Sequence, residues 1–145
     1  MGCMVGRLAL NNTWEISRID STFYPESEQT MSRRQILQAY AEFCQAKQDQ
    51  EMAKGGKLSN TILIKPIVNL FVGEFKGADF RKHMNQQAAS KQFLGRVRDL
   101  IHHGIEYYAQ FNEEALDKAN GERQVMPTHM LLEELKLKQE IEKVN

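Results

Sequence analysis

Apolar side chains recur every three or four residues through much of the chain, a spacing typical of helices that pack one face against a core. The clearest run contains five such residues: Ile36, Leu37, Tyr40, Phe43 and Cys44. Ser32 can cap the start of this helix, and Gly55 followed by Gly56 can end it. The pattern therefore predicts one long amphipathic helix after residue 32.

A second and a third helix are predicted further along the chain. The second begins at Ser59 or Asn60 and turns these residues inward: Ile62, Leu63, Ile67, Leu70 and Phe71. Pro66 lacks an amide N–H and should kink this helix, which Gly73 ends. The third helix carries three apolar residues on one face: Phe80, Met84 and Ala88.

A fourth helix continues the apolar stripe through seven residues: Phe93, Val97, Leu100, Ile101, Ile105, Tyr108 and Phe111. Gly95 and Gly104 interrupt it, and each glycine costs up to about 1 kcal/mol relative to alanine within a helix. We expect Gly104 to lie where another helix approaches closely. The predicted fold class is mainly α, with these helices packed as a bundle.

The first residues of the chain have a different character. Residues 2–5 are small or apolar, as in a strand covered on both faces, and the predicted strand ends at Gly6 and Arg7 before a helix begins. Free N–H groups at the start of that helix and the Arg7 guanidinium would meet in one place. The sequence therefore predicts a phosphate-binding site at Gly6 and Arg7.

The segments around the predicted bundle are more polar. A stretch around Pro25 has no periodicity and is interpreted as a linker. Near the C-terminus, Thr128 can cap a charged helix with five apolar residues: Met130, Leu131, Leu135, Leu137 and Ile141. This appended helix could contact a partner protein.

The net charge of zero conceals a strong segregation of charge along the chain. Residues 54–103 contain nine basic and three acidic residues, so the segments on either side are net acidic. The basic residues are Lys54, Lys57, Lys65, Lys76, Arg81, Lys82, Lys91, Arg96 and Arg98. Such a density is typical of a nucleic-acid footprint, and a solvated helical surface is the alternative.

Other features limit the classes of protein to consider. The sequence contains neither an apolar run long enough to cross a bilayer nor a secretory signal, which favours a cytoplasmic protein without a membrane partner. A longer N-terminus could nevertheless carry an organelle address. Cys3 and Cys44 are expected to pack as small apolar residues.

Two pairs of neighbouring aromatic residues have side chains that can bind a metal ion or a nucleic-acid base. His102 and His103 lack a Cys or acidic partner at metal-ligand spacing, so the sequence predicts no metal site and a pair that faces solvent or nucleic acid. Tyr107 and Tyr108 could stack on a base, but their place on an apolar stripe favours the core.

Several short motifs occur in an order that resembles a known family. They are Gly2-x-Met4-Val5-Gly6-Arg7, Ala9 with Asn12-x-Trp14, Leu70-Phe71-x-Gly73, and Gly77-Ala78 before Phe80-Arg81-Lys82. Together they resemble the C-terminal part of a tRNA dihydrouridine synthase of the bacterial-type branch. The sequence departs from the family pattern at Thr13, where Pro is usual, and at Asp79, close to where Arg is expected.

The resemblance implies a division of the chain into four parts. Residues 1–22 would be the last strand and helix of a flavin-binding (β/α)₈ barrel, and residues 23–31 the linker. Residues 32–120 would form a helical tRNA-binding domain. Residues 121–145 would be the appended charged helix.

The resemblance also implies an activity for the intact enzyme. In this family reduced FMN passes a hydride to a uridine of the tRNA D-loop, an upstream Cys supplies a proton, and NADPH regenerates the flavin. Because the catalytic Cys and most of the barrel lie upstream of the residues present, we assign no catalytic residue and expect no cofactor on the isolated chain.

The resemblance assigns binding roles to five residues of this sequence. Gly6 and Arg7 would contact the flavin phosphate, while Lys65, Arg81 and Lys82 would contact the tRNA backbone. The implied partners are tRNA and the remainder of the barrel. Two alternatives stay open: a stand-alone helical protein-interaction module without catalytic activity, and a fragment that complements a separately encoded barrel.

Overall fold

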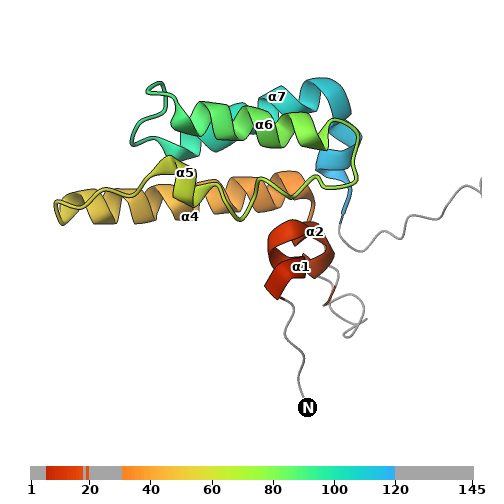
Figure 1. The fold of residues 1–145 in the computed structure, drawn as a ribbon, viewed down its shortest axis with the longest axis horizontal. Coiled ribbons are helices and arrows are strands. Elements are labelled where there is room, and N and C mark those ends of the chain that lie inside the picture. Colours follow the sequence, from red (N-terminus) through yellow and green to blue (C-terminus); the bar gives the residue numbers. More distant parts are fainter. Residues whose placement is uncertain (1–5, 18, 20–30, 120–145) are drawn as a thin grey trace, which may run out of the picture.

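The computed structural model describes residues 6–17, 19 and 31–119, and this part of the chain is mainly helical (Figure 1). Its helices are α1 (Gly6–Asn11), α2 (Thr13–Ser17), α4 (Arg33–Ala53), α5 (Asn60–Leu63), α6 (Gly77–Ala89) and α7 (Val97–Asp117). The described residues contain no strand and a single isolated β-bridge, between Ser32 and Ala119. The predicted mainly α, bundle-like class is confirmed at this level.

Helix α4 begins and ends as its sequence predicts. The Ser32 hydroxyl accepts a hydrogen bond from the Gln35 N–H at 3.3 Å, and the Gln35 side chain accepts one from the Ser32 N–H at 2.9 Å. This reciprocal pair satisfies two backbone donors at the helix start. The prediction for Phe43 was wrong, because this side chain is 55% exposed and lies to the side of the face formed by Leu37 and Cys44.

The predicted second helix is mostly not a helix. Helix α5 has only four residues, and the chain then continues in turns up to Gly73, which has a φ of +85°. Pro66 cannot donate an amide hydrogen bond, which explains why no longer helix forms across it. Ile62 is 56% exposed, contrary to the prediction, whereas the apolar residues beyond it are buried at steps of three or four: Ile64, Ile67, Leu70 and Phe71.

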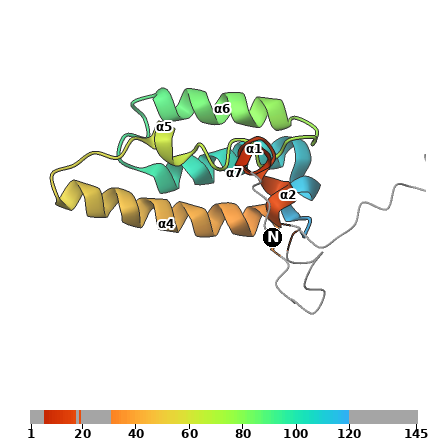
Figure 2. The same cartoon turned by 60° about the horizontal axis from the view of Figure 1, so that its bottom comes forward.

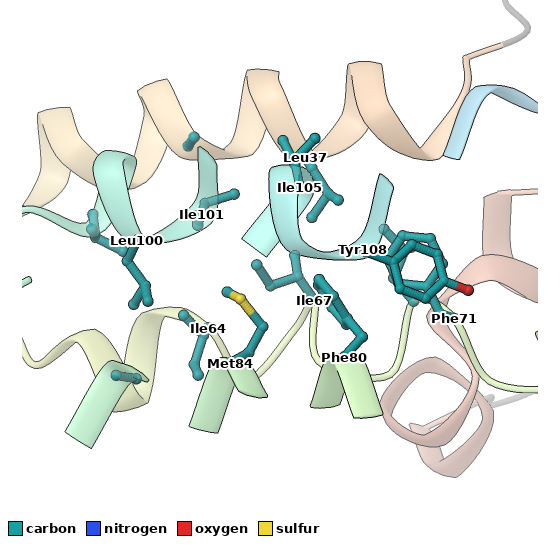
Figure 3. Packing of buried hydrophobic residues seen from close by; sticks show 14 of the residues in the cluster. Leu37, Ile64, Ile67, Phe71, Phe80, Met84, Leu100, Ile101, Ile105 and Tyr108 are labelled. Atoms are coloured by element: carbon teal, nitrogen blue, oxygen red, sulfur yellow. The ribbon is translucent and has the colours of Figure 1, made fainter. Parts of the chain in front are cut away.

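Helices α6 and α7 pack closely at Gly104, and Figure 3 shows Phe80 and Met84 of α6 pointing toward the α7 side of the core. A Cβ added at Gly104 would overlap the Met84 sulfur and approach the Phe80 ring, so the predicted close approach is confirmed. Phe93 is buried but precedes the helix, as does Gly95, and the prediction that both lie within it was wrong. Phe111 lies on α7 but is 44% exposed rather than buried.

Helix α7 lies beside both long neighbours, α4 and α6, and it runs antiparallel to each (Figures 1 and 2). Helix α5 and the turns after it lie between α4 and α6 in the second view. The beginning of α4, the beginning of α6 and the end of α7 therefore meet at one end of the bundle. Helices α1 and α2 lie at that same end.

A buried arginine joins the elements at this end. Arg33 is 1% exposed and donates to the carbonyl oxygens of Leu70 and Ala115, both at 3.0 Å, and to the Glu74 carboxylate at 2.8 Å. Its guanidinium also lies 4.0 Å from the centre of the Trp14 ring. Burial lowers the Arg33 pKa, and Glu74 opposes that shift. Arg33 is thus a structural residue, which its place in the sequence did not reveal.

The N-terminal helices pack on the same core as the bundle. Trp14 is 8% exposed and belongs to the main apolar cluster. The Thr13 hydroxyl donates to the Pro66 carbonyl at 3.0 Å, and the Asn69 amide donates to the Leu10 carbonyl at 2.8 Å. These contacts fix α1 and α2 against the turns that follow α5.

Several predictions fall on residues outside the described ranges. These are the strand at residues 2–5, most of the linker at 23–31, and the appended helix at 121–145. The division of the chain into four parts accordingly stays a prediction. Within the described ranges, no helix is both long and apolar enough to cross a membrane.

Candidate nucleic-acid interface

The structure separates the basic residues of segment 54–103 into two groups. Four of them have an acidic partner: Lys54 with Glu51 at 3.2 Å, Lys76 with Asp79 at 2.8 Å, Arg96 with Asp99 at 3.5 Å, and Arg98 with Glu42 at 3.5 Å. The ion pair of Arg98 joins α7 to α4. These four positive charges are partly neutralised within the molecule.

The remaining five basic residues of the segment are exposed, and none has an acidic partner within ion-pairing distance in the described ranges. They are Lys57, Lys65, Arg81, Lys82 and Lys91. Each lies on α6 or in the segments directly next to α5 and α6. We refer to these five residues as the free cations; they leave the α5–α6 side of the bundle with a positive charge that a polyanion could neutralise.

All three predicted tRNA-contacting residues belong to the free cations. Lys65 lies in the turn after α5, while Arg81 and Lys82 are neighbours on α6. Arg81 lines a cavity of about 240 Å³ together with Val68 and Asn69. Neighbouring residues of a helix point about 100° apart, so Lys82 is directed away from this cavity. Arg81 and Lys82 therefore point in different directions from α6, and Lys65 adds a third positive charge from the turn after α5.

Asp79, close to where the resembled family usually has Arg, lies in the first turn of α6. Its ion pair with Lys76 lowers the Asp79 pKa and raises the Lys76 pKa. A carboxylate in the first helical turn also interacts favourably with the helix dipole. The departure from the family pattern thus has a local structural role, and it leaves Arg81 and Lys82 as the positive residues of α6.

Gly6 and Arg7, the predicted phosphate-binding residues, lie in the first turn of α1, and the strand predicted before them falls outside the described residues. Both are exposed, and no heavy atom lies within 4 Å of the position a Gly6 Cβ would take, apart from its chain neighbours. They offer exposed backbone and a guanidinium, but the described residues do not enclose a flavin phosphate. Any such site would need walls from the rest of a barrel.

Four aromatic side chains line the contact between α6 and α7. The rings of His83 and Tyr107 are stacked with centroids 3.8 Å apart, and His83 Nε2 lies 3.5 Å from His103 Nδ1. His103 also meets the edge of Phe93. Burial and His103 both lower the His83 pKa. His103 is therefore a packing residue, contrary to the expectation of an outward-facing pair.

The two tyrosines also differ in environment. Tyr108 is fully buried and donates a hydrogen bond to the Phe75 carbonyl at 2.7 Å, as expected for a core residue. Tyr107 is half-buried and borders the surface at Phe111, with ring centroids 5.2 Å apart. Of the two, only Tyr107 has a position from which it could take part in a surface contact.

A second cavity, of about 590 Å³, lies at the end of the bundle where α4 and α6 end, opposite the end that carries α1 and α2. Two of the free cations, Lys57 and Lys91, line it together with the exposed apolar residues Met52 and Leu94. Gln48 and Asn60, which form its inner wall, are hydrogen-bonded to each other at 2.8 Å. The free cations therefore extend along most of the length of α6.

The described residues hold no group of three or more His, Cys, Asp or Glu side chains placed to bind a metal ion. Cys44 is buried, and this burial raises the pKa of its thiol. A buried thiol with a raised pKa is a poor nucleophile. Neither observation places redox or metal chemistry in this part of the chain.

In comparisons with known proteins, no family model, curated protein or solved structure matches this chain.

Proposed function

We propose that this chain is the C-terminal part of a flavin-dependent tRNA dihydrouridine synthase and that its helical domain binds tRNA. The main support for tRNA binding is the set of free cations along α5 and α6, which are exposed and have no acidic partner in the described ranges. Exposed positive charge that is not neutralised within the protein can replace the counterions of a phosphate backbone and so favours binding.

The local structure at Thr13 supports the family assignment. Thr13 is the first residue of α2, and the first position of a helix is where proline is best tolerated, because no intrahelical N–H bond is lost there. The family's usual Pro at this position is therefore compatible with the same backbone. Gly77, the first glycine of the last motif, is needed because a Cβ would overlap the Phe71 carbonyl oxygen.

In the intact enzyme this piece would supply tRNA binding and part of the flavin phosphate site. Gly6 and Arg7 would contact the phosphate of FMN, which supplies the hydride chemistry, and the catalytic residues would come from the barrel. A cytoplasmic location goes with this proposal. The intact mass of the native protein tests it: a barrel upstream adds roughly 250 residues, so the mass would lie far above 16.8 kDa.

Titration of a labelled tRNA transcript with the full chain tests the binding function. We expect the logarithm of the association constant to fall linearly with the logarithm of the salt concentration, because Lys65, Arg81 and Lys82 would displace counterions from phosphates. Salt-independent binding, or none, would contradict the proposal. Either result, together with a stable complex with another protein, would instead support a helical protein-interaction module.

A further inference from the structure

An exposed aromatic surface lies at the end of the bundle where α6 begins. Phe75 is 67% exposed and Phe111 is 44% exposed. The Lys76 ammonium lies 5.9 Å from the centre of the Phe75 ring and 6.0 Å from that of Phe111. Tyr107 extends this surface, since its ring meets the edge of the Phe111 ring. Two large apolar rings are thus presented to solvent around one lysine.

The backbone that carries Phe75 is held firmly from inside. Its carbonyl oxygen accepts hydrogen bonds from the Tyr108 hydroxyl at 2.7 Å and from the Asn112 amide at 3.4 Å. Gly77 lies directly against the Phe71 backbone, so the turn cannot shift without disturbing the core. These contacts fix the Phe75 backbone and so limit where its exposed ring can lie. A rigid support for an exposed group is a common property of binding sites.

Lys76 itself adopts an unusual backbone conformation. Its φ of +61° is the only positive φ of a non-glycine residue in the described ranges. This left-handed conformation is unfavourable for a lysine, and glycine would adopt it without strain. The lysine side chain at this position pairs with Asp79 and lies near both rings. Strain of this kind tends to occur at functional sites.

The chemistry of this surface matches an unpaired nucleotide. A base offers an aromatic face for stacking on phenylalanine, and a phosphate of the same strand would meet the free cations Arg81 and Lys82 further along α6, because Lys76 is already paired with Asp79. Two carboxylates near the site have partners within the protein, since Asp79 pairs with Lys76 and Glu74 with Arg33. Arg81 and Lys82 continue the positive charge along the same helix.

We infer that Phe75 and Phe111, with Lys76 between them, form a stacking site for an unpaired base of an RNA loop. This inference rests on the proposed binding of tRNA and adds to it the class of nucleotide recognised. The free cations would contact the backbone of the RNA irrespective of its pairing. The aromatic site would distinguish RNA with unpaired bases from a continuous duplex.

The test compares two RNA probes with the full chain and with Phe75→Ala, Phe111→Ala and Phe75→Trp. The probes are a labelled tRNA transcript and a blunt RNA duplex without unpaired nucleotides. We expect each alanine variant to bind tRNA about tenfold more weakly, since a stacked base contributes about 1–3 kcal/mol, while duplex binding stays unchanged. Phe75→Trp should keep the affinity because it keeps an aromatic face.

Phe43→Ala is the matched control, because Phe43 is an equally large aromatic residue, 55% exposed on α4 and outside the free cations, so its loss should not affect binding to tRNA. Unchanged tRNA binding by both alanine variants, or equal losses on tRNA and duplex, would overturn the stacking site and leave the proposed tRNA binding intact. Failure of the unaltered chain to bind either probe would overturn both proposals. Thermal unfolding of each variant checks that the exposed substitutions leave the fold unchanged.

Discussion

Arg33 and the free cations of the α5–α6 side are basic residues of one small domain in opposite environments. Arg33 is 1% exposed, and its guanidinium donates to two carbonyl oxygens and one carboxylate. Lys65, Arg81 and Lys82 are exposed and have no such partners in the described ranges. Arg33 therefore stabilises the fold, whereas the free cations are available to a ligand. The charge of a residue in the sequence does not distinguish these two roles.

The largest expected effect is the loss of stability on removing the buried guanidinium. Arg33→Met leaves the Leu70 and Ala115 carbonyl oxygens without this donor and breaks the ion pair of Glu74. We expect the free energy of unfolding to fall by about 3–5 kcal/mol, as for other broken buried ion pairs. Unfolding in urea, followed by circular dichroism, measures the change.

Arg34→Met is the matched control for this substitution. Arg34 is the next residue and pairs with Asp117 at 2.6 Å, but it lies at the surface, with its side chain 26% exposed. Exposed ion pairs contribute about 0–1 kcal/mol, and the two parallel hydrogen bonds from Arg34 to Asp117 place this pair at the upper end of that range, still below the loss expected for Arg33. Equal losses for the two variants would contradict the distinction between buried and surface arginines.

A smaller loss of stability is expected from a substitution at Gly77, the first residue of α6. Gly77→Ala should lower the free energy of unfolding by about 1–3 kcal/mol, because the added Cβ would overlap the Phe71 carbonyl and force the backbone to move. Gly6→Ala is the control, since its Cβ would have open space and it also lies in a helix. If Gly77→Ala proved as stable as Gly6→Ala, the close approach would be wrong.

The stability of the fold should depend on pH through His83, which lies at the boundary between core and surface. Burial and His103 lower its pKa in the folded chain, so the unfolded chain, with a pKa near 6.5, takes up its proton at higher pH. Stability should therefore fall as the pH drops below about 6.5 and stop falling below the lowered pKa.

The substitution His83→Gln removes this titrating group. The free energy of unfolding, measured in urea, should differ less between pH 7.5 and a pH below 6.5 in this variant than in the unaltered chain. His102→Gln should keep the full difference. An unchanged pH dependence in His83→Gln would rule out His83 as its source.

Much of the helical architecture follows from local sequence patterns. The Ser32 cap and the buried face of α6 were predicted correctly because each depends on neighbours along one helix. The close approach at Gly104 was also predicted, because a glycine on an apolar helical stripe leaves room for the side chains of a second helix. The segment after α5 was not, since Pro66 permits a series of turns that bury apolar residues at nearly the same spacing as a helix. Phe43, Ile62 and Phe111 show that an apolar residue on a helical stripe can still lie outside the core.

The candidate site was predictable only in part. The excess of basic residues in segment 54–103 is visible in the sequence, and the family resemblance selected Lys65, Arg81 and Lys82 among them. Which cations have acidic partners depends on contacts between helices, such as that of Arg98 with Glu42, and sequence spacing does not give these. Phe75 was missed altogether, although an aromatic residue between Gly73 and Gly77 is a signal of a tight turn that presents a ring.

The most direct test of the account compares two triple variants that remove the same charge from different sides of the bundle. Lys65→Ala/Arg81→Ala/Lys82→Ala removes three free cations, and Lys47→Ala/Lys54→Ala/Lys118→Ala removes one lysine on α4 and the lysines that directly follow α4 and α7. We predict that the first variant keeps its stability within about 0.5 kcal/mol. It should nevertheless bind tRNA much more weakly, with a salt dependence reduced by about two to three ions. The second variant should retain most of its affinity, and equal losses of tRNA binding in the two variants would contradict a binding surface on the α5–α6 side.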